Sequence, residues 1–166
     1  MRIEELFARH AGELYQYAAR YTGDADLAED VVQDTFVRLA ARPPRDATQV
    51  RAWLFRVATT VAIDALRSAR RRLRLLDQRR GDVPVPQPAG DPAAEVERAE
   101  VRRRVRAALA DLGERERAVL LMREAGFAHR EIADAVGTTT GSVGTMIARA
   151  LDKLATRLDL DGEEAP

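Results

Sequence analysis

The chain has 166 residues, of which 46% are hydrophobic, 33% charged and only 5% aromatic, and its formal net charge is zero. Alanine, leucine and arginine dominate and are strong helix formers, so we expect an all-α fold. The chain has no cysteine, which excludes disulfides and thiolate metal sites, and His10 and His129 lie far apart in sequence. We therefore expect no metal and no cofactor.

Charge is distributed unevenly along the chain. Residues 22–37 contain five acidic residues and no basic one, whereas residues 67–80 contain seven arginines and a single aspartate. This pattern predicts one surface for a basic protein partner and another for phosphates. Residues 1–11 mix charged with apolar side chains and no run approaches membrane-spanning length, so we expect a cytoplasmic protein without a membrane partner.

The first predicted elements are three helices. Apolar side chains recur at three- and four-residue intervals from Leu6 to Tyr21, Gly23 ends this helix, and Asp24 caps a second one that reaches about Ala41. Two prolines stop the second helix.

A third helix is expected to start where Asp46 and Gln49 have the spacing of a capping box. It carries Trp53, which we interpret as a core residue rather than a base-stacking one, and it ends near residue 75. These helices make up a predicted N-terminal domain over residues 1–76.

A proline-rich segment follows. Residues 79–92 read RRGDVPVPQPAGDP, and their four prolines remove backbone donors and disfavour helix in the residues before them. We predict a flexible linker over residues 77–93; the alternative is an ordered surface loop within one domain.

The second half is predicted to hold helices over about residues 94–111, 114–124 and 129–136, with a last helix through Leu154. This gives a C-terminal domain over residues 94–158 and a frayed acidic tail over residues 159–166. Residues 128–151, AHREIADAVGTTTGSVGTMIARAL, have the layout of a helix-turn-helix. The small Ala133 allows close helix packing, Gly137 suits the tight turn, and Val143 anchors the second helix.

Two stretches of the chain resemble one known family. Residues 112–154, LGERERAVLLMREAGFAHREIADAVGTTTGSVGTMIARALDKL, are similar to the promoter-reading C-terminal domain of extracytoplasmic-function (ECF) sigma factors. Two runs of the first half, LYQYAARYTGDADLAEDVVQDTFVRLA and RAWLFRVATTVAIDALRSARRR, resemble their N-terminal domain, in the expected order. The resemblance implies a sigma factor that binds RNA polymerase core and directs promoter-specific transcription initiation.

The resemblance also implies a docking surface for the polymerase. Asp30, Gln33, Asp34 and Val37 match the family surface that docks on the clamp helices of the largest polymerase subunit, and an acidic face suits a basic partner. The alternative is an ordinary solvated helix face. The partners that the family implies are the core enzyme, through its clamp helices and flap, promoter DNA and an anti-sigma factor.

The family's DNA-reading positions can be carried over in the same way. Thr60 and Asp64 fall where the family reads the separated strand of the minus-ten element, beside a basic track. The expected minus-ten residues are Arg56, Thr60, Asp64, Arg67, Arg70 and Arg71. The expected minus-thirty-five residues are Arg123, Arg130, Thr140, Ser142, Thr145 and Arg149. The recognition helix departs from the family pattern, since Gly144 and Met146 stand where basic residues are usual.

Two other classes of function are alternatives for this chain. A stand-alone helix-turn-helix regulator would explain the second half and leave the acidic helix without a role. An enzyme is not expected, because the carboxylates of residues 29–34 lack the Glu-x-x-His repeats of a di-metal bundle and phosphate-loop and nucleophile motifs are absent.

Overall fold

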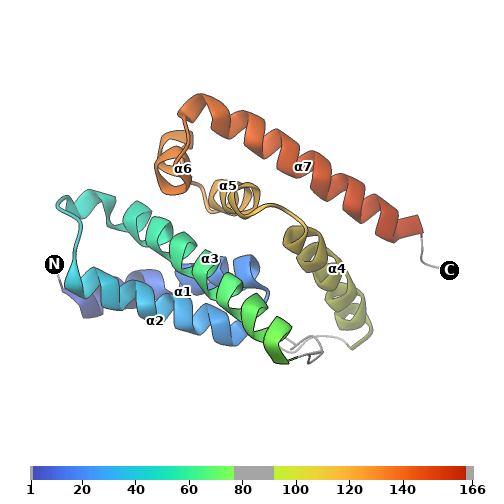
Figure 1. Cartoon of the computed structure of the whole chain (residues 1–166), viewed down its shortest axis with the longest axis horizontal. Helices are drawn as coiled ribbons and strands as arrows, with labels where there is room; N and C mark the ends of the chain where they lie inside the picture. The colour runs from blue at the N-terminus through green and yellow to red at the C-terminus, as the bar shows by residue number, and fades with distance from the viewer. Residues whose placement is uncertain (1, 77–91, 164–166) are drawn as a thin grey trace.

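The computed structural model describes residues 2–76 and 92–163, and within these ranges it contains helices and no strand, which confirms the all-α prediction. The N-terminal elements are α1 (Ile3–Thr22), α2 (Ala25–Ala41), the short 3₁₀ turn η1 (Ala47–Gln49) and α3 (Val50–Leu76). The C-terminal elements are α4 (Pro92–Ala110), α5 (Glu114–Glu124), α6 (His129–Val136) and α7 (Thr140–Glu163). Figure 1 shows α1–α3 bundled on one side and α4–α7 on the other, with α5 and α6 facing the first bundle.

The first bundle forms where the sequence pattern predicts it. Gly23 adopts a left-handed φ of 69° and ends α1, and the Asp24 carboxylate accepts the N–H of Leu27 at 3.0 Å to cap α2. Leu14, Leu54 and other apolar side chains of the three helices are fully buried between them. This hydrophobic core continues into the second half, where the Phe127 ring lies 4.7 Å from that of Phe55.

The start of the third helix differs from the predicted capping box. The Asp46 carboxylate accepts hydrogen bonds from the backbone and the hydroxyl of Thr48, at 2.9 and 2.7 Å. The Gln49 N–H bonds to the Asp46 carbonyl at 3.2 Å, which closes a 3₁₀ turn. Because Asp46 is occupied by Thr48, the reciprocal pair with Gln49 does not form and α3 begins at Val50.

The helix-turn-helix prediction is confirmed by α6 and α7. Gly137 has a φ of 67° and its N–H bonds to the carbonyl of Ala133, so the glycine supplies the left-handed turn that ends α6. Ile132 and Val143 are fully buried and Ala133 nearly so. The small alanine lets α6 and α7 pack closely, as the sequence indicates.

Both ends of the second half extend further than predicted. Helix α4 begins at Pro92, a residue type suited to the first turn, so the last two residues of the predicted linker are helical. The rest of that segment, residues 77–91, lies outside the described residues. Helix α7 continues to Glu163, so residues 159–163, which the sequence assigns to a frayed tail, are helical. The turn that precedes this extension is tied to the rest of the second half, because Arg157 pairs with Asp111 at 2.8 Å and Arg104 donates to the carbonyl of Leu158 at 2.7 Å.

Candidate nucleic-acid interface

The predicted polymerase-docking residues share one face of α2. Asp30, Gln33, Asp34 and Val37 have the spacing i, i+3, i+4 and i+7, which aligns them along one side of a helix. Asp30 and Gln33 are exposed, Asp34 is partly exposed and pairs with Arg38 at 3.0 Å, and 66% of Val37 is accessible to solvent. This face is therefore acidic and also offers one exposed apolar side chain, Val37, to a partner.

The predicted minus-ten residues form a stripe along α3. Arg56, Thr60, Asp64, Arg67 and Arg71 follow one another at four- and three-residue steps. All of them, and Arg70 beside them, are exposed. The Thr60 hydroxyl donates to the Arg56 carbonyl at 3.3 Å, and Asp64 interrupts the run of positive charge. The stripe is a basic track with a polar centre.

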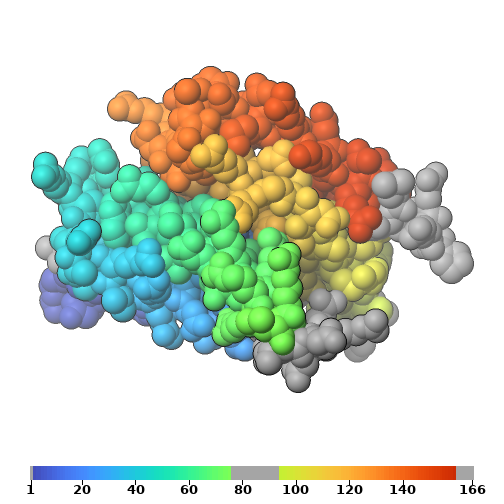
Figure 2. All heavy atoms as spheres, viewed as in Figure 1, coloured from blue at the N-terminus to red at the C-terminus, as the bar shows by residue number. Residues whose placement is uncertain are grey.

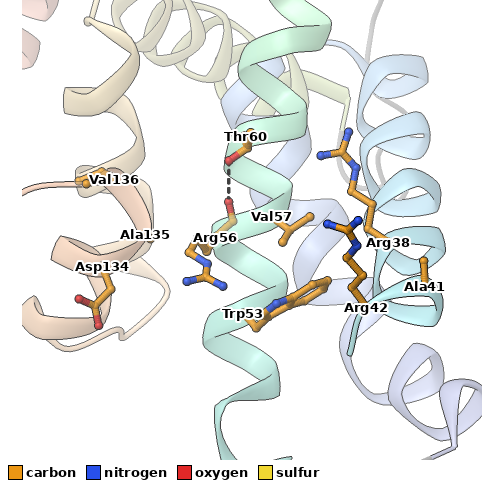
Figure 3. Close-up of a pocket in the computed structure, with 11 residues that line it drawn as sticks. Arg38, Ala41, Arg42, Trp53, Arg56, Val57, Thr60, Asp134, Ala135 and Val136 are labelled. Atoms are coloured by element: carbon orange, nitrogen blue, oxygen red, sulfur yellow. Dashed lines mark hydrogen bonds between the residues drawn. The ribbon is translucent and has the colours of Figure 1, made fainter. Parts of the chain in front are cut away.

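A groove runs beside this stripe, between the first bundle and α6. Figure 3 shows the side chains of Arg38, Arg42 and Arg56 around the indole of Trp53, with Asp134 on the opposite wall. Trp53 is half-buried: it packs against the core, as predicted, and also lines the groove. Sequence reasoning missed Arg38 and Arg42; their position at the end of an acidic helix is the signal that could have indicated them.

The predicted recognition helix presents few side chains to solvent at its start. Thr140, Thr145 and Arg149 are exposed. Ser142 is half-buried, and its oxygen lies 2.8 Å from the hydroxyl of Thr139, which also accepts the Ser142 N–H at 3.2 Å. The Ser142 hydroxyl is thus engaged in closing the start of α7.

Gly144 and Met146, which stand where the family usually has basic residues, face the interior of the second half and not the solvent. A Cβ added to Gly144 would lie 3.9 Å from Cε1 of His129, so this position faces α6. Met146 is partly buried against the core. Further along α7, the Lys153 ammonium pairs with Glu116 at 2.6 Å. Arg149 is therefore the candidate cation at the exposed start of this helix.

The two remaining minus-thirty-five candidates lie on other helices. Arg123, near the end of α5, and Arg130, in the first turn of α6, are both exposed. Arg130 lines a second groove with Trp53 and Arg56. In the packed arrangement it lies against the first half of the chain.

Arg67 has a partner on the other half of the molecule. Its guanidinium donates to both oxygens of Glu114, at 2.9 and 2.7 Å. These hydrogen bonds hold the pKa of the Glu114 carboxyl below its ordinary value. The sequence carries no signal for this contact, because it joins residues of two separate helical units.

The described residues contain neither a metal-binding cluster nor a helix suited to cross a membrane. Among residues 2–76 and 92–163, no group of three histidine, cysteine, aspartate or glutamate side chains is arranged to hold a metal ion. His10 instead lies 2.8 Å from Glu13. Within the same ranges, none of the helices has the length and apolar character needed to cross a bilayer.

Comparison with known proteins identifies both halves. Residues 6–72 match Sigma-70 region 2, and residues 102–154 match Sigma-70, region 4. The chain is 34% identical to the ECF RNA polymerase sigma factor SigG of Mycobacterium tuberculosis over 87% of its own length and 45% of that relative. It is 48% identical to SigL of the same organism over 42% of its own length and 41% of that relative. The chain thus spans less than half the length of these two curated relatives.

Solved structures support the same assignment. The sigma factor RpoE from Bartonella quintana, solved with the anti-sigma factor NepR, superimposes with a TM-score of 0.73 at 21% identity, over 95% of this chain and 97% of that one, which shows the shared fold. CnrH, solved with the cytosolic domain of CnrY, has a TM-score of 0.66 at 30% identity, over 96% of this chain and 88% of that one.

The helical architecture, the helix-turn-helix and the two matched regions define a protein of the sigma-70 class with a region 2 and a region 4. Within this class, the chain belongs to the ECF RNA polymerase sigma factor family.

Proposed function

We propose that this protein binds RNA polymerase core and directs it to particular promoters, where transcription starts. The observation that carries the proposal is the combination of three surfaces in one chain: an acidic face on α2, a basic stripe on α3 and a helix-turn-helix in α6 and α7. A DNA-binding regulator without polymerase contacts would leave the acidic face unexplained.

The acidic face of α2 is the proposed dock for the clamp helices of the largest polymerase subunit. Asp30, Gln33 and Asp34 supply polar and negative groups, and the exposed Val37 supplies apolar contact at the C-terminal end of the same face. Opposite charges across such an interface steer association and fix the register. The second half is proposed to contact the polymerase flap.

The two DNA elements are assigned to different halves. The α3 stripe (Arg56, Thr60, Asp64, Arg67, Arg70 and Arg71) is proposed to bind the separated minus-ten strand, because exposed cations beside a half-buried tryptophan suit a single strand. Thr140, Thr145 and Arg149 of α7 are the proposed minus-thirty-five contacts. Arg123, Arg130 and Ser142 are assigned supporting roles.

The division of labour is proposed to follow separate units. Residues 1–76 dock on the polymerase and bind the minus-ten element, residues 94–158 bind the minus-thirty-five element, and residues 77–93 connect them. The match of the two halves to different family regions, residues 6–72 and 102–154, supports this division. Since the Bartonella relative was solved with an anti-sigma factor, a protein inhibitor of this kind is a further proposed partner.

Reconstituted transcription tests the proposal. Core polymerase is mixed with the full-length protein and a library of promoter-containing fragments from its own genome, and the 5′ ends of the transcripts are sequenced. Core plus protein is expected to give new, clustered start sites that core alone does not give. A chain that binds duplex DNA and yields no core-dependent start sites would instead be a helix-turn-helix regulator.

A further inference from the structure

The groove between the first bundle and α6 has the size of a small-molecule site. Its volume is about 700 Å³, within the range of roughly 300–1,000 Å³ that is usual for ligand pockets. The end of α2, the N-terminal part of α3 and the end of α6 line it. Figure 2 shows the atoms of α6 lying against those of α3, so the groove has walls from both halves of the chain.

The α3 wall of the groove carries the only tryptophan of the chain. Trp53 is half-buried and packs against the core, and Val57 lies one turn further along the helix. Trp53 also lines an adjoining groove of about 380 Å³. An indole that is held by the core and still borders a groove provides a flat apolar surface on which a planar heterocyclic ring can stack.

Three arginines surround this indole (Figure 3). Arg38 and Arg42 come from the C-terminal end of α2, and Arg56 comes from α3. Arg38 pairs with Asp34 at 3.0 Å, whereas Arg42 and Arg56 have no ion-pair partner within residues 2–76 and 92–163. Guanidinium groups bind phosphate oxygens with two parallel hydrogen bonds. This side of the groove therefore suits a ligand with more than one negative charge.

The opposite wall carries the reverse charge. Asp134, near the end of α6, lines the groove, is exposed and has no ion-pair partner in the part of the chain that the structure describes. An ionised carboxylate only accepts hydrogen bonds. The Watson–Crick edge of guanine presents two adjacent donors, N1–H and the 2-amino group, whereas adenine presents one amino group beside an acceptor nitrogen. Guanine is therefore the purine that this wall suits better.

We propose that this groove binds a guanine nucleotide with at least two phosphates. The base stacks on Trp53 and donates to Asp134, and the phosphates accept hydrogen bonds from the three arginines. An amino acid carries a single carboxylate and would leave two guanidiniums without a partner. Inorganic pyrophosphate would leave the indole and Asp134 unused. The proposal does not depend on promoter binding, because it requires only the folded chain.

The single tryptophan makes binding directly measurable. The full-length protein is titrated with GDP at low salt and followed by Trp53 fluorescence and by calorimetry. GDP is expected to quench the fluorescence saturably, with one nucleotide bound per chain. Pyrophosphate is expected to bind about tenfold more weakly without quenching, because stacking is lost. Absence of saturable GDP binding would overturn the proposal, and so would equal affinity for GDP and pyrophosphate.

Arg42→Gln tests the phosphate contact, and Arg45→Gln is its matched control. Both arginines are exposed and lie three residues apart, and Arg45 lines neither groove. Arg42→Gln is expected to weaken GDP binding about fivefold to tenfold, because a charge-assisted pair of hydrogen bonds is lost. Arg45→Gln is expected to leave the affinity unchanged. Equal losses in the two variants would indicate general attraction to a basic surface and would refute the site.

Asp134→Asn tests the recognition of the base. The unaltered chain is expected to bind ADP about tenfold more weakly than GDP, since adenine turns an acceptor toward the carboxylate. An amide both donates and accepts, so Asp134→Asn is expected to bring the two affinities within about twofold of each other. Thermal unfolding of the variant checks that the fold is retained. A preference for GDP that is absent from the unaltered chain, or that persists in Asp134→Asn, would contradict the assignment of guanine to this groove.

Discussion

The two helices assigned to DNA in this protein differ sharply in charge. Helix α3 exposes Arg56, Arg67, Arg70 and Arg71, whereas Arg149 is the one ionised residue between Thr140 and Leu151. The later cations of α7 are turned to their own half, as the Lys153 pair with Glu116 illustrates. This difference predicts that phosphate attraction is concentrated in region 2, and that region 4 binds DNA through close approach by small, neutral side chains.

The halves also differ in the polar group that they bury: a guanidinium, that of Arg117, in the second half and hydroxyl groups in the first. The prediction with the largest effect concerns Arg117. Arg117→Met keeps a long aliphatic side chain and leaves three carbonyls, those of Tyr21, Ala110 and Leu112, without their charged donor. The free energy of unfolding is expected to fall by about 3 kcal/mol. Urea unfolding followed by circular dichroism measures the change.

The matched control lies in the first half, where the Tyr17 hydroxyl is 2.6 Å from that of Thr59. Tyr17→Phe leaves Thr59 bonded to the Phe55 carbonyl, so a loss of about 1 kcal/mol is expected. If Arg117→Met costs no more than Tyr17→Phe, the buried guanidinium is not what stabilises the corner between α4 and α5.

The second prediction separates polymerase docking from DNA binding. Asp30→Arg combined with Asp34→Arg is expected to weaken binding to core polymerase by about 2–3 kcal/mol, because two attractive charges become repulsive. Helical content is expected to stay unchanged, since both side chains reach solvent. Competition binding against labelled core measures the effect.

The control for the same charge change is Glu97→Arg combined with Asp152→Arg, at two exposed positions of the second half. Equal losses of core binding in both double variants would remove the docking assignment.

Arg149 provides the third prediction. A bidentate contact between arginine and guanine contributes about 1–3 kcal/mol, so Arg149→Ala is expected to lower promoter-dependent transcription by that amount. Lys153→Ala is the control, because its ammonium is already held by Glu116. Full transcription by Arg149→Ala would show that the second half positions the polymerase through other residues.

The salt dependence of promoter affinity tests the charge difference between α3 and α7 directly, and the expected effect is smaller. Each phosphate contact adds roughly 0.7 to 0.9 to the slope of log affinity against log salt. Arg70→Gln with Arg71→Gln is expected to reduce the slope of promoter binding by about 1.5, and Arg149→Gln by less than 1. Titration of the sigma–polymerase complex with promoter DNA at several salt concentrations gives both numbers. The opposite ranking would place the phosphate contacts in region 4.

Sequence predicted the helices of this protein well because each boundary has a local cause. Gly23, Asp24 and Gly137 act through their own backbone or their next neighbours, and these effects can be read without a fold. The prediction for the start of α3 is less accurate. Two donors on Thr48 occupy the Asp46 carboxylate, so the expected capping box with Gln49 does not form.

The candidate site was only partly predictable for a different reason. Residues of one helix face, such as Asp30 and Asp34, share a periodicity that sequence displays. The Arg67–Glu114 pair and the groove between α3 and α6 join positions from separate units, and no periodic pattern encodes them. The engagement of Ser142 with Thr139 depends on a rotamer at a helix start, which the residue types alone leave open.

The glycines of the recognition helix give the last and smallest prediction. Glycine inside a helix costs roughly 0.5–1 kcal/mol relative to alanine, because it loses more backbone freedom on folding. A Cβ at Gly141 would meet nothing within 4 Å, and one at Gly144 would make an ordinary contact with His129. Both Gly141→Ala and Gly144→Ala are therefore expected to stabilise the protein by up to about 1 kcal/mol in urea unfolding. Their effects on DNA binding are expected to differ. Gly141 is exposed at the start of α7, where we propose that the backbone comes close to the DNA, whereas Gly144 faces α6. Gly141→Ala should weaken promoter binding about twofold to threefold while Gly144→Ala leaves it unchanged, a difference corresponding to roughly 0.4–0.7 kcal/mol. Equal promoter affinity for the two variants would argue against close backbone approach and leave the uncharged start of α7 without a role in DNA binding.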